Sequence, residues 1–202
     1  MIKVFEHLPH NKAAENNKAA ILSALKQLNL SSLQVFEIGS GTGQHGIYFC
    51  QNMLDMQWQP SETEDNLPLT QAWYNAAQAI PILNYQSPIS FAIGNRFPNI
   101  SFNTIYSANV LHIVQTDEAR TLIEQASQVL SSGQRFVCYG PFKVNGEFTT
   151  ESNHAFNDWL QQQGFGGLID IADIEYWSKQ QLKVTYQIPM PANNFLLVFE
   201  KE

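Results

Sequence analysis

The chain has few basic residues and no long apolar run, and each shortage excludes a class of protein. Its 202 residues include 11 Lys and Arg against 18 Asp and Glu, which gives a formal net charge of −7. Binding to nucleic acid needs a basic stripe and binding to an anionic membrane surface needs a cluster of cations, so we expect neither partner. No apolar stretch reaches the roughly 18 residues of a membrane-spanning helix.

The chain is also poor in cysteine. Cys50 and Cys138 are its two cysteines, and both lie among apolar residues. They predict buried thiols in a reducing compartment, not a disulfide pair. The N-terminus lacks the basic segment and apolar run of a signal peptide, so we expect a cytoplasmic location. No zinc-ligand spacing joins the cysteines to the five histidines, and we expect no metal site.

The most informative stretch is residues 35–43, which read Val-Phe-Glu-Ile-Gly-Ser-Gly-Thr-Gly. The apolar run favours a buried strand. The three glycines that follow at alternate positions favour a turn that brings bare backbone close to a ligand, because a Cβ would block the approach or forbid the turn. Residues 44–53 favour a helix whose first unpaired N–H groups face the same ligand. A tight strand-to-helix turn without a ligand is the alternative interpretation.

The spacing of these glycines separates two cofactors. A dinucleotide-binding loop reads Gly-x-Gly-x-x-Gly, which would put the third glycine at residue 44, where this chain has Gln. Glu37 stands two residues before the first glycine, where a carboxylate repels a pyrophosphate and attracts an ammonium group. A nicotinamide dehydrogenase is therefore disfavoured, and a ligand with an amino group is favoured.

Strands and helices are expected to alternate along the chain. Hydrophobic periodicity predicts helices over 13–28, 44–53, 66–80, 117–130, 154–162 and 172–181. Strands are expected over 34–38, in a short segment ending near 60, and over 89–93, 104–108, 135–139, 182–188 and 195–200. Alternation of this kind is typical of a parallel sheet with helices on both faces.

The last two expected strands depart from this rule. Only about six residues, 189–194, separate them, too few for a crossover helix, so they must form an antiparallel hairpin. We therefore predict an α/β fold in one domain over residues 1–202, with a doubly wound, mostly parallel sheet of seven strands that ends in this hairpin. Ligands of such sheets bind beyond the carboxyl ends of the strands, so the loops at that edge carry the candidate site.

An acid follows the second expected strand. Glu62 lies 25 residues beyond Glu37, a spacing that suits a carboxylate accepting hydrogen bonds from both hydroxyls of a ribose. Glu64 is a rival for this role. The segment from Ser61 to Glu64 also matches the pattern of a helix capping box. In that interpretation the segment starts a helix and binds no ligand.

The loop after the fourth expected strand contains Asn109 and His112. An imidazole that is neutral near pH 7 can take a proton from an attacking oxygen or nitrogen, so His112 is the candidate general base. A histidine that packs its helix against the sheet is an equally good interpretation. His45 falls just after the glycines and is expected to be a residue of the helix start.

These features together resemble a known family. An acid followed by Gly-x-Gly-x-Gly resembles the first motif of the class I S-adenosylmethionine-dependent methyltransferases, whose Rossmann-like sheet places the last strand between the fifth and the sixth. Over most of its length the chain resembles the uncharacterised methyltransferase-like family that includes methyltransferase-like protein 26 (domain of unknown function 938). The motifs that carry this resemblance lie at residues 15–18, 37–45, 58–62, 108–113, 139–143, 145–148 and 190–194.

The resemblance implies S-adenosylmethionine as cofactor, with S-adenosylhomocysteine as product. It implies a set of cofactor-binding residues: Asn17, Lys18, Glu37, Gly39, Ser40, Gly41, Gly43, Glu62, Asn95 and Asn109. Asn17 and Lys18 would belong to an N-terminal helical lid over residues 1–30. The family usually has Asp at position 62 and Arg at position 16, where this chain has Glu62 and Asn16.

Another departure concerns the adenine. Methyltransferases usually carry an acid after the third strand that contacts the adenine amino group, and this chain offers Asn95, whose carbonyl oxygen can accept the same hydrogen bond. The resemblance implies methyl transfer to a small-molecule or protein acceptor, with His112 as the catalytic residue. A protein that binds the cofactor without catalysis is the alternative, and the missing acid favours it slightly. The oligomeric state is left open.

Overall fold

The computed structural model describes residues 3–28 and 32–202, which group into two compact units. The first unit comprises residues up to 92 together with 98–102, and the second comprises 93–97 and 103–202. Of the expected lid over residues 1–30, positions 1, 2, 29 and 30 lie outside the described residues. The expectation of a single domain stays a prediction.

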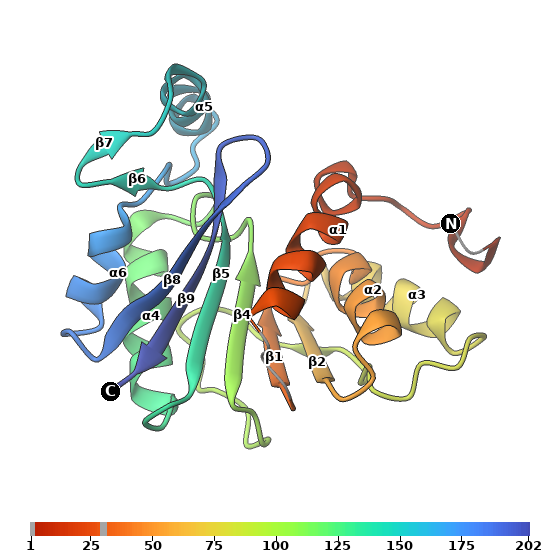
Figure 1. The fold of residues 1–202 in the computed structure, drawn as a ribbon. Coiled ribbons are helices and arrows are strands. Elements are labelled where there is room, and N and C mark those ends of the chain that lie inside the picture. The colour runs from red at the N-terminus through yellow and green to blue at the C-terminus, as the bar shows by residue number, and fades with distance from the viewer. Residues whose placement is uncertain (1–2, 29–31) are drawn as a thin grey trace. The chain divides into compact units, whose positions relative to one another are not determined.

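The described residues of the first unit form three parallel strands and three α-helices, and most of these elements can be followed in Figure 1. Its strands pair in the order β3-β2-β1, and α2 and α3 pack against β2 while α1 packs against α2. The elements are η1 (Lys3–Phe5), α1 (Lys12–Gln27), β1 (Gln34–Ile38), α2 (Gln44–Asn52), β2 (Gln57–Glu62), α3 (Leu67–Ala77) and β3 (Ile89–Ser90).

Local sequence explains the boundaries of α1 and β1. The side chain of Asn11 caps α1 by accepting a hydrogen bond from the N–H of Ala14, and Ile21 and Leu25 are buried on its inner face. Every residue of β1 after Gln34 is buried, as expected for a central strand of a parallel sheet. The glycine loop, residues 39–43, starts where this strand ends.

The second unit contains the remaining strands. Strand β4 pairs parallel to β5, β5 pairs antiparallel to β9, and β9 pairs antiparallel to β8. The elements are β4 (Thr104–Ala108), α4 (Thr116–Val129), β5 (Arg135–Gly140), β6 (Lys143–Val144), β7 (Glu147–Phe148), α5 (Glu151–Gln162), α6 (Ile171–Trp177), β8 (Leu182–Met190) and β9 (Asn194–Lys201).

The predicted fold class is confirmed. The structure has a mostly parallel sheet of seven strands, formed by β1 to β5 with β8 and β9, and a separate small hairpin of β6 and β7. The last strand lies between the fifth and the sixth strand of the sheet, as the resemblance implied, because β9 pairs with both β5 and β8. The carboxyl-terminal hairpin is antiparallel, as its short connection required.

Several element boundaries differ from the predictions. Strand β3 has two residues where five were expected, and the chain then turns at Gly94, which has a φ of +93°. Helix α3 ends at Ala77, before Ile80, whose helical conformation is disfavoured by the following Pro81. Helix α6 ends at Trp177 because left-handed residues follow at positions 179 and 180. Strand β2 continues to Glu62, and the β6–β7 hairpin was not predicted.

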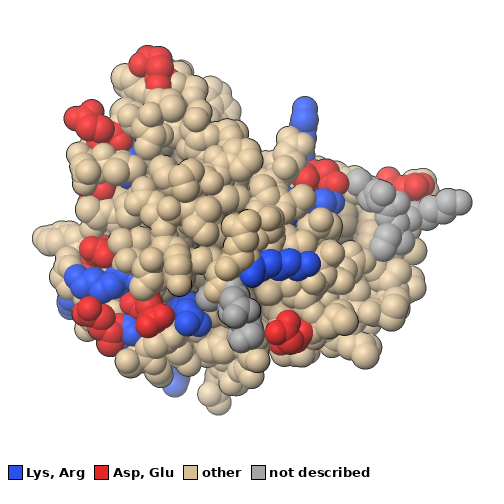
Figure 2. All heavy atoms as spheres, viewed as in Figure 1, with Lys and Arg blue, Asp and Glu red and all other residues tan. Residues whose placement is uncertain are grey.

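The surface and the thiols agree with the composition. Figure 2 shows charged side chains scattered singly and in mixed groups of both signs on the face in view, with wide uncharged areas between them. Cys50 and Cys138 are buried free thiols, as predicted, and burial raises the pKa of both well above its usual value. Among the described residues, none of the helices is long and apolar enough to cross a membrane.

Candidate functional site

The glycine loop turns sharply between β1 and α2. Its three glycines have φ angles of +72°, +57° and +83°, a region that residues with a Cβ rarely adopt. The turn is held by two backbone hydrogen bonds, from Ser40 N–H to Ser61 O over 3.0 Å and from Gly43 N–H to Ser40 O over 2.8 Å. Gly43 is also the N-cap residue of α2, so the loop leads directly into the first turn of that helix.

The glycines of the loop differ in what surrounds them. A Cβ added to Gly41 would meet no atom within 4 Å, so its backbone faces open space. A Cβ added to Gly43 would lie 2.5 Å from the hydroxyl oxygen of Tyr85 and 3.3 Å from the Thr70 methyl group. The space beside Gly41 therefore fits a ligand held against bare backbone, whereas Gly43 is required by packing beneath the loop.

Glu37 lies under the loop with only 2% of its surface exposed. Its Oε2 accepts hydrogen bonds from the indole N–H of Trp58 and from the hydroxyl of Ser40, each over 2.7 Å. Burial raises the pKa of the Glu37 carboxyl to about 7, and these two donors offset part of that effect. The sequence prediction missed Trp58 as the partner of this acid.

Glu62 is fixed at the end of β2 and is 8% exposed. Its Oε2 accepts the N–H of Gly41 over 2.7 Å, and its Oε1 accepts the N–H of Thr63 over 2.8 Å. The rival Glu64 is exposed. The capping-box alternative is wrong, because Ser61 lies within β2 and donates its hydroxyl to the backbone oxygen of Glu37 over 2.6 Å.

Two further side chains beneath the loop were not predicted. Thr70, on α3, donates its hydroxyl to Gly41 O over 2.6 Å. The hydroxyl of Tyr85 is buried beside Gly43 without a hydrogen-bond partner among the described residues. Neither residue belongs to a recognisable motif, because each reaches the loop from a distant part of the chain.

The two candidate residues on α1 have partners of their own. Asn17 Oδ1 and His45 Nε2 are joined by a hydrogen bond of 2.6 Å, and burial lowers the pKa of His45 to about 4. The ammonium group of Lys18 donates to Glu15 Oε1 over 2.6 Å. The nitrogen also lies 5.0 Å from the ring centre of Tyr48. His45 is the second residue of α2, which confirms that it belongs to the helix start.

In the second unit, Asn109 and His112 follow β4. Asn109 has a φ of +57°, rare for a residue with a side chain, and its N–H donates to Tyr139 O over 2.8 Å. A Cβ on Gly140 would lie 3.4 Å from His112 Nδ1 and 3.9 Å from Asn109 Oδ1, so both side chains gather at the end of β5.

His112 is 6% exposed, and burial lowers its pKa to about 4, which keeps the imidazole neutral at pH 7. Within residues 3–28 and 32–202, the structure records no hydrogen bond to either nitrogen of its ring. Its ring packs against Phe156 edge to face, with the centroids 5.8 Å apart. A neutral imidazole can accept a proton, and this one also packs against Phe156. Its placement is therefore compatible with a general base and with a packing residue, the two interpretations from the sequence.

Asn95 also belongs to the second unit and is exposed. Its backbone oxygen accepts a hydrogen bond from Gln125 Nε2 over 3.0 Å, and Gln125 Oε1 accepts the N–H of Gly94 over 3.1 Å. These bonds hold the loop against α4 and leave the side-chain amide of Asn95 for other contacts. No group of His, Cys, Asp and Glu among the described residues is arranged to hold a metal ion.

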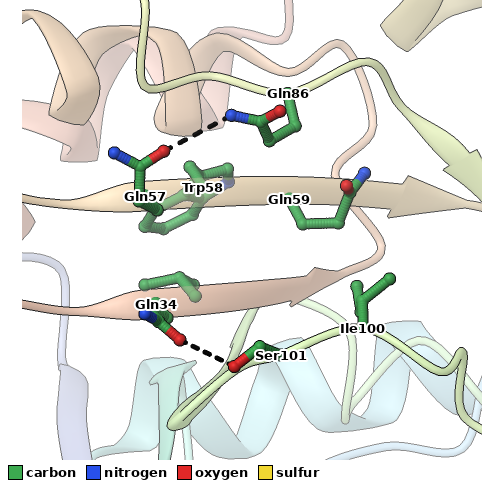
Figure 3. A pocket seen from close by; sticks show the side chains of 8 residues that line it. Gln34, Gln57, Trp58, Gln59, Gln86, Ile100 and Ser101 are labelled. Atoms are coloured by element: carbon green, nitrogen blue, oxygen red, sulfur yellow. Dashed lines mark hydrogen bonds between the residues drawn. The ribbon is translucent and has the colours of Figure 1, made fainter.

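A cavity of about 290 Å³ lies at the opposite ends of β1 and β2 from the glycine loop (Figure 3). It is lined by amide side chains, including Gln34 and Gln57, which are the first residues of their strands. Gln86 Nε2 donates to Gln57 Oε1 over 3.4 Å, and the Ser101 hydroxyl donates to Gln34 Oε1 over 3.0 Å. This cavity is not at the edge where the predicted site residues lie.

Comparison with known proteins identifies the family. Residues 8–201 match the family described as "Protein of unknown function (DUF938)". The chain belongs to this family. The match covers nearly all of the sequence, which confirms the resemblance drawn from its motifs.

Solved structures of methyltransferases have the same fold. An O-methyltransferase family protein from Burkholderia thailandensis gives a TM-score of 0.76 at 13% identity, over 95% of this chain and 57% of that one. Human N-acetylserotonin methyltransferase in complex with SAM gives 0.74 at 11% identity, over 94% and 53%. An O-methyltransferase family 2 protein from Planctomyces limnophilus in complex with apigenin gives 0.72 at 14% identity, over 92% and 62%. The chain thus spans little more than half the length of these proteins, and the likeness establishes the fold.

Proposed function

We propose that this protein is an S-adenosylmethionine-dependent methyltransferase. The observation that carries the proposal is the glycine loop itself: the N–H of Gly41 is held by Glu62, and open space lies beside the Gly41 backbone. A loop of bare backbone at the carboxyl end of the first strand, with an acid at the end of the second, suits a nucleoside that carries an amino acid. The shared fold with methyltransferases supports the same conclusion.

The residues of the loop and Glu62 would hold the amino-acid portion and the ribose of the cofactor. When bound, S-adenosylmethionine supplies a methyl group on a positively charged sulfur: its carbon–sulfur bond breaks as the carbon bonds to the acceptor, and neutral S-adenosylhomocysteine leaves. Gly39, Ser40, Gly41 and Gly43 would face the amino-acid portion, and Glu62 would accept hydrogen bonds from the ribose. Asn17, Lys18, Asn95 and Asn109 stay predictions as further contacts.

Glu37 would favour a ligand with a positive charge. Its pKa near 7 means that the carboxyl is only partly ionised at neutral pH. An ammonium group nearby would favour the ionised form, because opposite charges in a buried site attract strongly. Binding of a cation would therefore remove a proton from Glu37, whereas a neutral ligand would not.

His112 would act as the general base on an acceptor whose attacking atom loses a proton, of which a hydroxyl group is the simplest. Its pKa of about 4 leaves the ring nitrogen free to accept that proton at neutral pH, and the proton would then pass to water. The remaining contribution of the protein is to align the acceptor and exclude water. A small molecule and a protein side chain are both possible acceptors.

A cofactor-binding protein without catalysis is the second candidate. It is favoured by the exposed Asn95 in place of an acid after the third strand, because this change weakens the expected contact with the adenine. Titration calorimetry with S-adenosylmethionine, S-adenosylhomocysteine and NAD tests the cofactor class for both candidates. We expect the first two to bind and NAD to give no heat; binding of NAD alone would overturn the proposal.

A matched pair of glycine variants tests the loop. Gly41→Val is expected to reduce affinity for S-adenosylmethionine at least tenfold, because its side chain would occupy the space beside the loop. Gly146→Val is the control, since Gly146 also has a positive φ and no atom near its Cβ but lies in the β6–β7 turn. Equal affinity in the Gly41 variant and the wild type would show that the assigned loop does not hold the cofactor.

Turnover separates the two candidates. The protein is incubated with S-adenosylmethionine labelled in its methyl group and with a fractionated cell extract as the source of acceptor. Transfer of label supports the methyltransferase, and its absence from every fraction, despite binding of the cofactor, supports the binding protein. Once an acceptor is found, His112→Asn is expected to lower kcat at least a hundredfold.

A further inference from the structure

A second cavity lies within the first unit and borders the end of the glycine loop, because Gln44, the residue after Gly43, lines it. Its volume is about 400 Å³, within the usual range for small-molecule sites. We call it the helical pocket; it is lined by residues of η1, α1, α2 and α3 that include Phe5, Glu15, Lys18, Tyr48, Gln51 and Trp73. Neither the glycines of the loop nor Glu37 and Glu62 line it.

The apolar side of the helical pocket is mostly aromatic. The rings of Phe5 and Trp73 are stacked, with centroids 4.8 Å apart and planes 12° from parallel. Trp73 is fixed by donating its indole N–H to Pro9 O over 2.8 Å. Ile47 and Tyr48 complete the apolar lining from α2. These side chains suit a flat apolar group that lies against the apolar side of the pocket.

The polar side of the helical pocket holds one charge of each sign. Lys18 and Glu15 are joined over 2.6 Å, and their side chains are 21% and 37% exposed. The ammonium group has three hydrogens, of which this bond uses one. Oε2 of Glu15 also accepts a hydrogen bond from Gln44 over 3.1 Å, which keeps the carboxylate in place. The hydrogen bond from Lys18 lowers the pKa of Glu15, so this carboxyl stays ionised at neutral pH.

We propose that the helical pocket binds an α-amino acid with an aromatic side chain. The ligand carboxylate would pair with Lys18, its ammonium group with Glu15, and its ring would lie against Phe5 and Trp73. A ligand with one charge fits less well, because an anion would meet the carboxylate of Glu15 and a cation would meet the ammonium of Lys18. Competition with the cofactor decides between this role for Lys18 and the cofactor contact that the sequence predicted for it.

Three related probes test the ligand class without any cofactor present. The three probes share the aromatic ring and differ in charge. L-phenylalanine carries both a carboxylate and an ammonium group, phenylacetate carries only the carboxylate, and phenethylamine carries only the ammonium group. Calorimetric titration of the full chain is expected to give an affinity for phenylalanine at least tenfold higher than for either of the others. No binding of phenylalanine at 10 mM, or equal binding of phenylacetate, would overturn the proposal.

Variants locate the binding. Lys18→Met is expected to lower the affinity for phenylalanine at least tenfold, and Lys26→Met, on an exposed part of the same helix, is the matched control. Gln51→Trp provides a second test, because it fills the cavity and removes no charge. Unchanged affinity in a folded Gln51→Trp variant would show that phenylalanine binds elsewhere.

Competition with the cofactor separates this proposal from the proposed function. Saturating S-adenosylmethionine is expected to change the affinity for phenylalanine less than twofold, because the residues of the glycine loop do not line the helical pocket. Full displacement of phenylalanine would assign the binding to the cofactor site and overturn the proposal. If S-adenosylmethionine does not bind at all, the proposed function fails, whereas the titrations with phenylalanine still decide the helical pocket.

Discussion

Trp58 donates its indole N–H to Oε2 of Glu37 over 2.7 Å, and both side chains are almost completely buried. Ser40 donates its hydroxyl to the same oxygen, so one atom joins β1, β2 and the glycine loop. Burial raises the pKa of the Glu37 carboxyl, and the two hydrogen bonds to Oε2 lower it. This balance leads to predictions for stability and for its dependence on pH.

Removal of the Trp58 donor is expected to destabilise the protein. Trp58→Phe keeps an aromatic ring but leaves a buried carboxylate oxygen with one donor fewer, which costs about 1–3 kcal/mol. Urea unfolding at pH 7.5 measures the change. Trp159→Phe is the matched control, because Trp159 is 49% exposed, and its loss should stay within about 0.5 kcal/mol. Equal losses in the two variants would contradict the role given to the indole N–H.

The sequence predicted the central strands well and the partners of their side chains poorly. Strands β1 and β4 have the expected bounds, since an apolar run ended by glycine or asparagine leaves little choice. The pairing of Trp58 with Glu37 depends on the register of two strands, in which Val35 lies opposite Trp58. A single sequence contains no signal for that register.

In the glycine loop, too, the sequence predicts the backbone conformation but not the packing partners. Positive φ angles at its glycines follow from the residue type. That Gly43 is needed for packing against Tyr85 follows only from the fold, because Tyr85 reaches the loop from 42 residues further along the chain. The place of Lys18 beside Glu15 follows from their i,i+3 spacing on α1, whereas its place over the ring of Tyr48 depends on how α1 packs against α2.

The stability of the protein is expected to fall as the pH rises through 7. The pKa of Glu37 is about 7 in the folded state against an ordinary value of 4.5, so between these values the folded state binds more protons than the unfolded state. The contribution of a protonated Glu37 is complete below pH 4.5 and is lost as the pH rises through 7. At 1.36 kcal/mol per unit, the loss amounts to about 3 kcal/mol.

Urea unfolding from pH 4.5 to pH 8 tests this dependence in the wild type and in Glu37→Gln. The variant keeps the size of the side chain and cannot ionise, so its stability should lack the decline that Glu37 contributes between pH 4.5 and 7. A parallel decline in both proteins would show that Glu37 is not its source.

His112 is expected to act in the opposite direction at lower pH. Its pKa is about 4 in the folded state against 6.5 ordinarily, so between these values the unfolded state binds more protons. The stability that follows from this difference is present above pH 6.5 and is lost as the pH falls through 4, by about 3 kcal/mol at 1.36 kcal/mol per unit. His45, also with a pKa of about 4, contributes with the same sign.

Unfolding free energies measured from pH 4 to pH 8 test the contribution of His112. In His112→Asn the rise between pH 4 and 6.5 should be shallower than in the wild type, and in His45→Asn likewise. Above pH 7.5 the difference between each variant and the wild type should no longer depend on pH. A full rise in His112→Asn would mean that this imidazole is not held in its neutral form.

Gly46 lies in the first turns of α2, where alanine would ordinarily be the better helix former by about 1 kcal/mol. Here the opposite is expected, because a Cβ on Gly46 would lie 2.6 Å from Tyr85 Cε2 and would also collide with the indole of Trp58. Gly46→Ala should therefore destabilise the protein by about 1–3 kcal/mol in urea unfolding.

The matched control for this variant is Gly140→Ala, at a glycine without a positive φ whose Cβ would come no closer than 3.4 Å to another atom. Its stability should change by less than about 1 kcal/mol. The collision at Gly46 involves the indole that holds Glu37, so Gly46→Ala should also weaken binding of S-adenosylmethionine. A loss of stability with unchanged affinity would show that the packing of α2 is independent of the cofactor site. A stabilised Gly46→Ala variant would show that helix propensity outweighs packing and that Trp58 can move away from Glu37 at little cost.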